Sequence, residues 1–243
     1  MQDSPASQSE EARLTRRRRL LAVLAATLGA VGVLLLADAL STVDWKEPLR
    51  KLNEQVEQHR LAAELEARER RAQDGNRAIA SSSPGSALSV DRVRREATRL
   101  RAETDVCDAL GRLRIPRLDL DYVVGEGTRA STIRNGPGHY AATDLPGVGG
   151  TVGIAGHRGS YLGPFRHLER LRRGDVISVD MPYGRFSYAV TATRVVDPAA
   201  IGVLRDVADE RLVLTTCHPP NSTKRLVVSA VRAGAVSQLE AQG

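Results

Sequence analysis

The chain has 243 residues, of which 42% are hydrophobic and 26% are charged. This composition excludes wholesale disorder and is typical of one or two folded domains. Two cysteines exclude a disulfide-stapled scaffold and a cysteine-rich metal site. The formal charge is +6 and aromatic residues are only 3%. Because the arginines cluster in the N-terminal half and few rings are available to stack on bases, we expect no nucleic-acid partner.

The first predicted element is an apolar helix over residues 20–40, preceded by a basic tail over residues 1–19 that contains Arg16, Arg17, Arg18 and Arg19. Residues 20–37 carry no charge, and at 1.5 Å per residue they reach about 27 Å, close to the thickness of a bilayer core. The alternative is a cleaved signal peptide, but the apolar run is longer than such a peptide needs. The arginines predict a cytoplasmic N-terminus and an extracellular remainder.

Residues 41–111 are interpreted as a helical stalk. Glutamates and arginines interleave over residues 46–71, as on a solvated helix with ion pairs one turn apart. The serine-rich segment 81–86 contains Pro84 and Gly85 and predicts a break, and a second amphipathic helix is expected over Val90–Ala109. The two helices are spacers in this interpretation, and the alternative is a coiled coil that binds a partner.

After Leu113 the sequence predicts a β domain over residues 112–235, followed by a short tail over residues 236–243. Short runs rich in β-branched residues alternate with Gly and Pro, which favours an all-β barrel or sandwich of seven to eight strands. The expected strands are 113–116, 118–124, 152–155, 176–179, 186–196, 212–216 and 226–231. One short helix is expected between Pro164 and Arg172.

Three residues of this domain are candidates for catalysis. His157 follows an apolar strand, Cys217 ends another, and Arg225 opens the next. A thiolate is a nucleophile, and a nearby cation favours the thiolate over the thiol. Arginine stays protonated at physiological pH, so its expected part is to stabilise an oxyanion, while the imidazole exchanges protons with an amine.

These residues and their flanks resemble the sortases, the cysteine transpeptidases of Gram-positive bacteria. The Leu-Val-Leu-Thr-Thr-Cys run at 212–217 is similar to the TLxTC motif of the family, and the segments 113–116, 135–140 and 155–165 also match it. The resemblance covers about half of the chain and implies a closed β-barrel with His157, Cys217 and Arg225 as the catalytic residues. No cofactor or metal is implied.

Within the family, the chain looks most like class E, which is associated with an LAxTG rather than an LPxTG sorting signal. That resemblance implies substrate binding by Tyr140, and we also expect substrate contacts from Thr216 and His218, which flank the cysteine. It implies secreted proteins that carry a sorting signal and a peptidoglycan precursor amine as partners, an anchor over residues 20–40, and an enzyme outside the cell of an actinobacterium.

Two other functions fit parts of the sequence. A catalytically idle, membrane-tethered β module could bind wall peptides, but it would tend to lose the Cys, His and Arg set that is present here. An L,D-transpeptidase also uses Cys and His, but it carries them close together in a Ser-His-Gly-x-Cys-like segment that this sequence does not contain.

Overall fold

The computed structural model describes residues 5–80, 90–159, 163–218 and 223–233, and in the first helix it describes the side chains of residues 16–38, 52–53 and 55–74. The chain divides into two compact units, Met1–Arg50 and Lys51–Gly243. Helix α1 (Pro5–Ala80) contributes to both units. The expected break over residues 81–86 lies outside the described residues.

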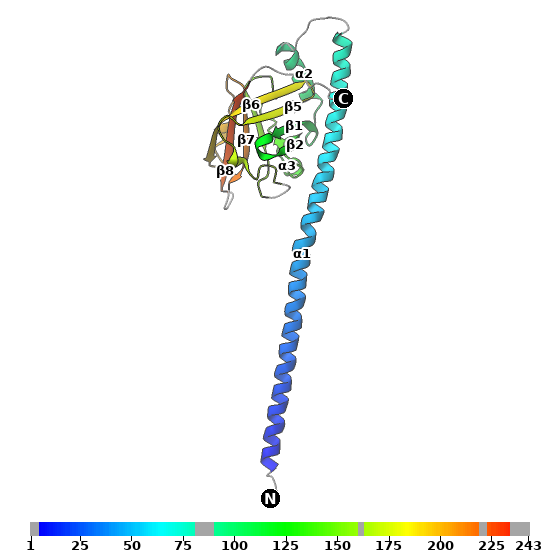
Figure 1. Ribbon diagram of the computed structural model, residues 1–243, viewed down its shortest axis with the longest axis vertical. Coiled ribbons are helices and arrows are strands. Elements are labelled where there is room, and N and C mark those ends of the chain that lie inside the picture. The colour runs from blue at the N-terminus through cyan, green and yellow to red at the C-terminus, as the bar shows by residue number, and fades with distance from the viewer. Residues whose placement is uncertain (1–4, 81–89, 160–162, 219–222, 234–243) are drawn as a thin grey trace. The chain divides into compact units, whose positions relative to one another are not determined.

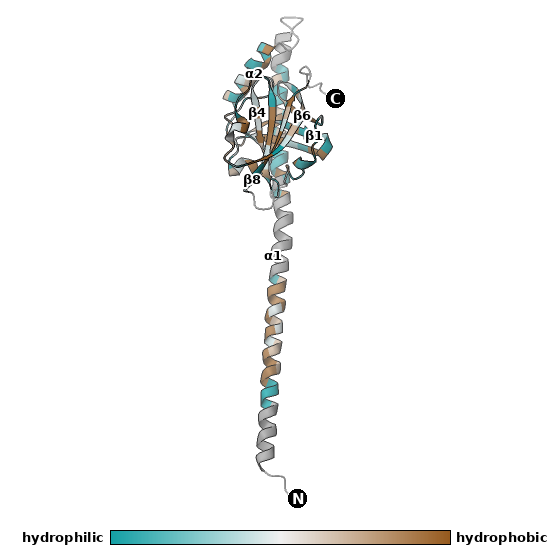
Figure 2. Ribbon diagram, turned by 90° about the vertical axis from the view of Figure 1, so that its left-hand side faces the viewer, coloured by the Kyte–Doolittle hydropathy of each residue, from teal (hydrophilic) through white to brown (hydrophobic). Residues whose placement is uncertain are grey.

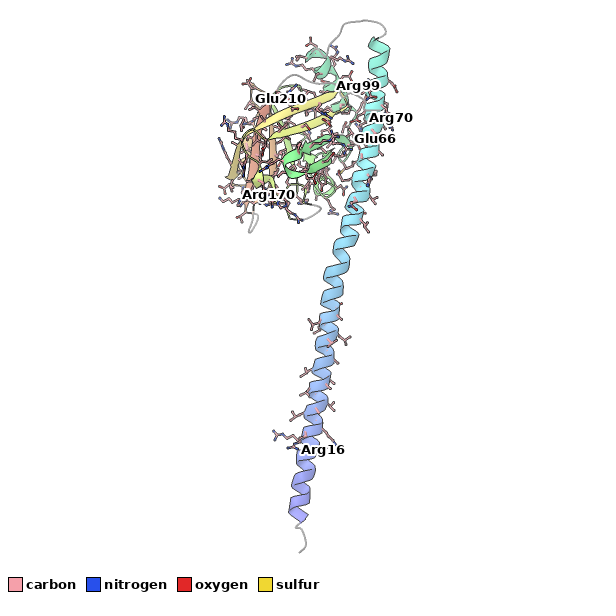
Figure 3. All side chains as sticks on the ribbon, viewed as in Figure 1. Arg16, Glu66, Arg70, Arg99, Arg170 and Glu210 are labelled. Atoms are coloured by element: carbon pink, nitrogen blue, oxygen red, sulfur yellow. The ribbon has the colours of Figure 1, made fainter. Side chains whose placement is uncertain are left out.

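Among the residues that the structure describes, the first unit holds one helical stretch, Arg16–Asp38, that is long and apolar enough to cross a membrane. Its mean hydropathy is 2.6, and none of it is buried by the rest of the protein. Figure 2 shows the hydrophobic run along α1, directly after the hydrophilic arginines, and Figure 3 labels Arg16 at its start. An apolar surface of this length is costly in water, and its burial needs a lipid phase or a partner.

The second unit is built around a closed β-barrel, as the sequence predicts. Within the described residues, eight strands follow the order β1-β2-β3-β4-β7-β8-β6-β5 (Figure 1). The strands are β1 (Ala109–Ile115), β2 (Leu120–Glu126), β3 (Gly138–His139), β4 (Thr151–Ala155), β5 (Val176–Met181), β6 (Gly184–Val196), β7 (Arg211–His218) and β8 (Lys224–Arg232). Closure removes the exposed edges that an open sheet would present to other chains.

The alternation of residues along the strands determines which side chains enter the barrel. Leu212 and Leu214 of β7 and Val228 of β8 are fully buried in the main core, together with Phe165 and Phe186. The residues between them on β7 and β8 therefore point to the outer face. Cys217 and Arg225 lie on this outer face.

Helix α2 (Val90–Ala102) belongs to the same core. Val93, Ala97 and Leu100 are buried, and all three pack with the barrel residues. The helix ends seven residues before the expected end at Ala109, because Ala109 is already the first residue of β1. The boundary expected at residue 112 therefore falls inside β1.

The remaining differences concern short elements. β3 has two residues and leaves no pattern that a sequence can reveal. In place of one helix over residues 164–172, the structure has a single 3-10 turn, η2 (Leu168–Arg170). Phe165, Leu168 and Leu171 are nevertheless buried together, as their spacing predicts. Helix α3 (Ala130–Ile133) and the 3-10 helices η1 (Pro116–Leu118) and η3 (Ile201–Leu204) complete the unit.

Candidate active site

The candidate site lies where β4 and β7 end and β8 begins. β7 and β8 are antiparallel, and their register places Cys217 directly opposite Arg225. Directly opposed residues share a face, with Cβ atoms about 4.5–5.5 Å apart. Both side chains are half-buried and alternate with core residues, so they lie together on the outer face of the barrel. The strand register alone therefore makes Cys217 and Arg225 neighbours on this face.

His157 reaches the same place from β4. β4 runs parallel to β7 with Ala155 beside Thr215, so the position of His157, two residues on, continues alongside Cys217. The backbone of this turn is held on both sides of the histidine. The Gly156 N–H donates to the Thr215 carbonyl at 3.1 Å, and the Phe165 N–H donates to the His157 carbonyl at 3.0 Å. The imidazole is thus carried by a fixed backbone rather than by a free loop.

The surroundings of His157 disfavour its charged form. Partial burial lowers the pKa of the imidazole below its usual value, and the positive charge of Arg134 lowers that pKa further. Arg134 is exposed at the end of α3 and lies 23 positions away in the sequence. The sequence gives no signal for this residue, since an isolated surface arginine is among the most common residues of this chain.

Tyr140 lies on the same outer face as the cysteine. Its hydroxyl and that of Thr215 are 2.8 Å apart in a hydrogen bond, and Thr215 shares its face of β7 with Cys217. The Tyr140 ring covers Gly153 of β4 together with Leu204 of η3, and a Cβ at Gly153 would overlap both side chains. Thr215 is therefore a second contact on this face that the sequence analysis did not select.

The side chains of Thr216 and His218 lie on the opposite face of β7 from that of Cys217. Thr216 is 3% exposed, and its hydroxyl donates to the Gly156 carbonyl at 2.7 Å. It therefore contacts the backbone beside His157. His218 is half-buried, is paired with Lys224 across the strands, and alternates with Cys217 to the opposite face.

The register also settles which basic residue of β8 faces the thiol. Lys224 is one position before Arg225, and its ammonium forms an ion pair with Asp197 at 2.6 Å.

Among the described residues, no group of three or more His, Cys, Asp or Glu side chains could hold a metal ion.

Comparisons with known proteins give the family. The sortase domain family matches residues 113–233. Sortase D of Bacillus subtilis is 32% identical over 129 residues, which cover 51% of this chain and 64% of that protein. Sortase SrtE1 of Streptomyces coelicolor is 32% identical over 133 residues, which cover 48% of this chain and 38% of that protein. The chain thus spans less than two thirds of the length of these curated relatives.

The fold comparison agrees with the sequence comparison. The solved structure of sortase E from Streptomyces avermitilis superposes with a TM-score of 0.52 at 30% identity, and the match covers 57% of this chain and 96% of that one. The matched region includes β4, β7 and β8, which carry Cys217 and Arg225 at opposed positions and lead to His157. Residues 113–233 are therefore a sortase domain, and the chain belongs to the sortase family of cysteine transpeptidases.

Proposed function

We propose that this chain attaches secreted proteins to the cell wall, with Cys217, His157 and Arg225 as its catalytic residues. The observation that carries the proposal is the strand register at the barrel rim, which pairs Cys217 with Arg225 and continues β4 toward His157. A nucleophile, a cationic hydrogen-bond donor and a proton carrier are the groups that acyl transfer requires.

The proposed reaction has two acyl-transfer steps. The Cys217 thiolate attacks the carbonyl carbon between Thr and Gly of a sorting signal, and Arg225 stabilises the oxyanion that forms. His157 takes up the proton that the Cys217 thiol loses when the thiolate forms, and it donates this proton to the departing glycine amine, which leaves a thioester to Cys217. The neutral His157 then accepts a proton from an incoming amine of a peptidoglycan precursor, which attacks the thioester and releases the thiolate.

Three residues around Cys217 have different proposed functions in substrate binding and in the positioning of His157. Tyr140 contacts the second residue of the signal from its place over β4, with its hydroxyl bonded to Thr215. Thr216 positions His157 through the Gly156 carbonyl. His218 ends β7 beside Cys217 and is proposed to contact substrate at the rim. The preferred signal is LAxTG, by resemblance to class E.

We further propose that residues 20–40 anchor the enzyme in the membrane, with residues 1–19 in the cytoplasm and the barrel outside the cell. The apolar stretch Arg16–Asp38 and the four arginines at its start support this topology. Residues 41–50 then serve as the connection between the anchor and the second unit.

The test of the nucleophile uses the two cysteines of the chain. Both Cys107 and Cys217 are free and half-buried, so Cys107→Ala is a matched control for Cys217→Ala. We expect the full chain to cleave an LAxTG peptide between Thr and Gly and to transfer it to a glycine amine. Because only Cys217 lies beside Arg225, Cys217→Ala abolishes transfer and Cys107→Ala retains it. Transfer by the Cys217→Ala protein would eliminate the proposed nucleophile, and a folded native chain without any turnover would favour the idle binding module.

A further inference from the structure

The part of α1 that belongs to the second unit is docked on the barrel. Leu61 and Leu65 are 3% and 1% exposed, and they form a separate cluster with Ala109 of β1 and Val123 of β2. One turn further on, Arg68 donates hydrogen bonds to Thr104 and to Asp108, at 2.8 and 2.9 Å. This stretch of the helix is therefore a part of the folded unit rather than a solvated spacer.

Gln58 precedes this cluster and bonds to the backbone of the barrel. Its Oε1 accepts the Val123 N–H at 2.9 Å, and its Nε2 donates to the Val123 carbonyl at 3.3 Å and to the Asn135 carbonyl at 2.7 Å. One side-chain amide thus satisfies three backbone groups that belong to two segments. Backbone groups in partly buried places need such partners.

The position of this amide follows from the sheet. β2 and β3 are parallel, and their register begins with Gly125 beside Gly138. Two residues earlier, Val123 would face Gly136, but the two strands have separated there and the Gln58 amide lies between them. A Cβ at Gly136 would overlap the amide nitrogen of Gln58, so the glycine makes room for it. The Gln58 amide therefore continues the hydrogen bonding between β2 and the segment that precedes β3.

The segment held by Gln58 is also the segment beside the candidate catalytic histidine. β3 and β4 are antiparallel with Gly138 opposite Ala155, so the turn 134–137, which directly precedes Gly138, lies at the same end of this strand pair as residues 156–158, which directly follow Ala155. Arg134, next to Asn135, acts electrostatically on His157. The elements next to this position also carry Cys217 on β7, Arg225 on β8 and Arg158 on its own segment, and the Arg158 guanidinium pairs with Glu169 at 2.8 Å.

We propose that Gln58 is a positioning residue that couples the docked helix α1 to the active site, by holding segment 134–137, and with it Arg134, beside His157. The inference rests on the proposed function, because it gives helix α1 a part in the catalysis that is proposed for the barrel. Loss of the amide releases the Asn135 carbonyl and lets Arg134 move away from the imidazole. The helix that carries the membrane anchor thereby influences the protonation of the catalytic histidine.

The test measures the titration of the His157 ring by NMR, in the full chain in detergent micelles with ¹³C-labelled histidine. The His157 signal is assigned by its loss in His157→Gln. We expect Gln58→Met to raise the titration midpoint toward the ordinary value of histidine, because Arg134 lowers the pKa of His157 only while it is held nearby. Transfer activity is expected to fall roughly threefold or more, mainly in kcat, as for other residues that act through a neighbour.

Two control variants separate positioning from mere loss of docking. Gln55→Met changes an exposed glutamine one turn earlier and is expected to leave the midpoint unchanged. Arg68→Met removes the contacts with Thr104 and Asp108 and is expected to lower the melting temperature without moving the midpoint. An equal shift in Arg68→Met would reduce Gln58 to a docking contact and overturn the proposal.

A double-mutant comparison gives the decisive outcome. In an Arg134→Gln background, Gln58→Met is expected to cause no further shift, because the charge that it displaces is already absent. A full shift in that background, or no shift in Gln58→Met itself, would refute the coupling.

If Gln58→Met does not fold, Gln58→Asn keeps the amide but is too short to reach both backbone segments, and the same shift is expected. The titration needs no turnover, so a failure of the proposed transpeptidation would be seen separately in the Cys217→Ala assay.

Discussion

At the scale of single residues, the site depends on a strand register that the core enforces. Leu212, Leu214 and Val228 must enter the barrel, which leaves Cys217 and Arg225 on the outer face. A slip by one residue would turn every side chain of β8 to the other face and would bury the charged side chain of Arg225. The packing of the aliphatic core therefore maintains the position of Cys217 opposite Arg225.

Tyr140 makes the substrate preference testable at this scale. Its ring covers Gly153 and its hydroxyl bonds to Thr215, two residues from Cys217, which supports the proposed contact with the second residue of the signal. We expect Tyr140→Ala to lower the ratio of LAxTG to LPxTG transfer, by about tenfold or less, as for one contact in an apolar site. A peptide library varied at the second signal position measures the ratio. Tyr140→Phe keeps the ring and tests the hydroxyl alone, and an unchanged ratio in Tyr140→Ala would remove this residue from the proposed substrate site.

The site residues differ in how far the sequence could reveal them. Cys217 and Arg225 stand at the ends of two recognisable strands, and the hairpin between them makes their pairing a local matter. Arg134 and Gln58 act only through contacts between segments 23 and 65 or more positions apart, and no pattern along the chain marks them. Thr216 was selected for its place beside the cysteine, whereas its bond to Gly156 depends on the parallel pairing of β4 and β7.

At the scale of elements, the two helices before the barrel contribute to its stability. Leu100 of α2 lies in the main core, and Leu61 and Leu65 of α1 cover the junction of β1 and β2. Burial of a leucine side chain contributes about 1.5–3 kcal/mol. Removal of either helix therefore exposes enough apolar surface to matter for a domain of ordinary stability.

Truncation of the chain tests these contributions. We expect the melting temperature to fall in the order 51–243, 90–243 and 112–243. The second fragment loses the cluster around Leu61 and Leu65, and the third also loses α2 and the first residues of β1. Thermal unfolding followed by circular dichroism measures the order. A 112–243 fragment as stable as 51–243 would show that neither helix supports the barrel.

The strands were predictable and the docking of the helices was not. Seven of the eight strands coincide with expected runs because half-buried strands alternate polar and apolar residues. The apolar part of the docked face of α1 is small, with Leu61, Ala62 and Leu65, and polar side chains such as Gln58 and Arg68 make the other contacts, so its pattern resembles that of a solvated helix. Such helices carry ion pairs one turn apart, and the chain has one between Glu66 and Arg70 (Figure 3).

At the scale of the whole molecule, the distribution of charge supports one orientation in the membrane. The apolar stretch Arg16–Asp38 begins with four arginines and contains no other charge before Asp38. An arginine at the centre of a bilayer costs about 2.5–3.5 kcal/mol even on insertion scales. Translocation of this tail is therefore disfavoured, which supports the proposed orientation with the second unit outside the cell.

Single cysteines on the two sides of the anchor test this topology in intact cells. In a Cys107→Ser, Cys217→Ser background, we expect Val90→Cys, at a position that is 62% exposed, to react with a membrane-impermeant maleimide. We expect Ser9→Cys to react only after the membrane is permeabilised, because the arginine run between it and the anchor retains the tail in the cytoplasm. Labelling of Ser9→Cys in intact cells would reverse the orientation. If the mature protein lacks the Ser9→Cys label even after permeabilisation and is shortened by the basic tail and the apolar segment together, the segment is a cleaved signal peptide and the barrel is not tethered by it.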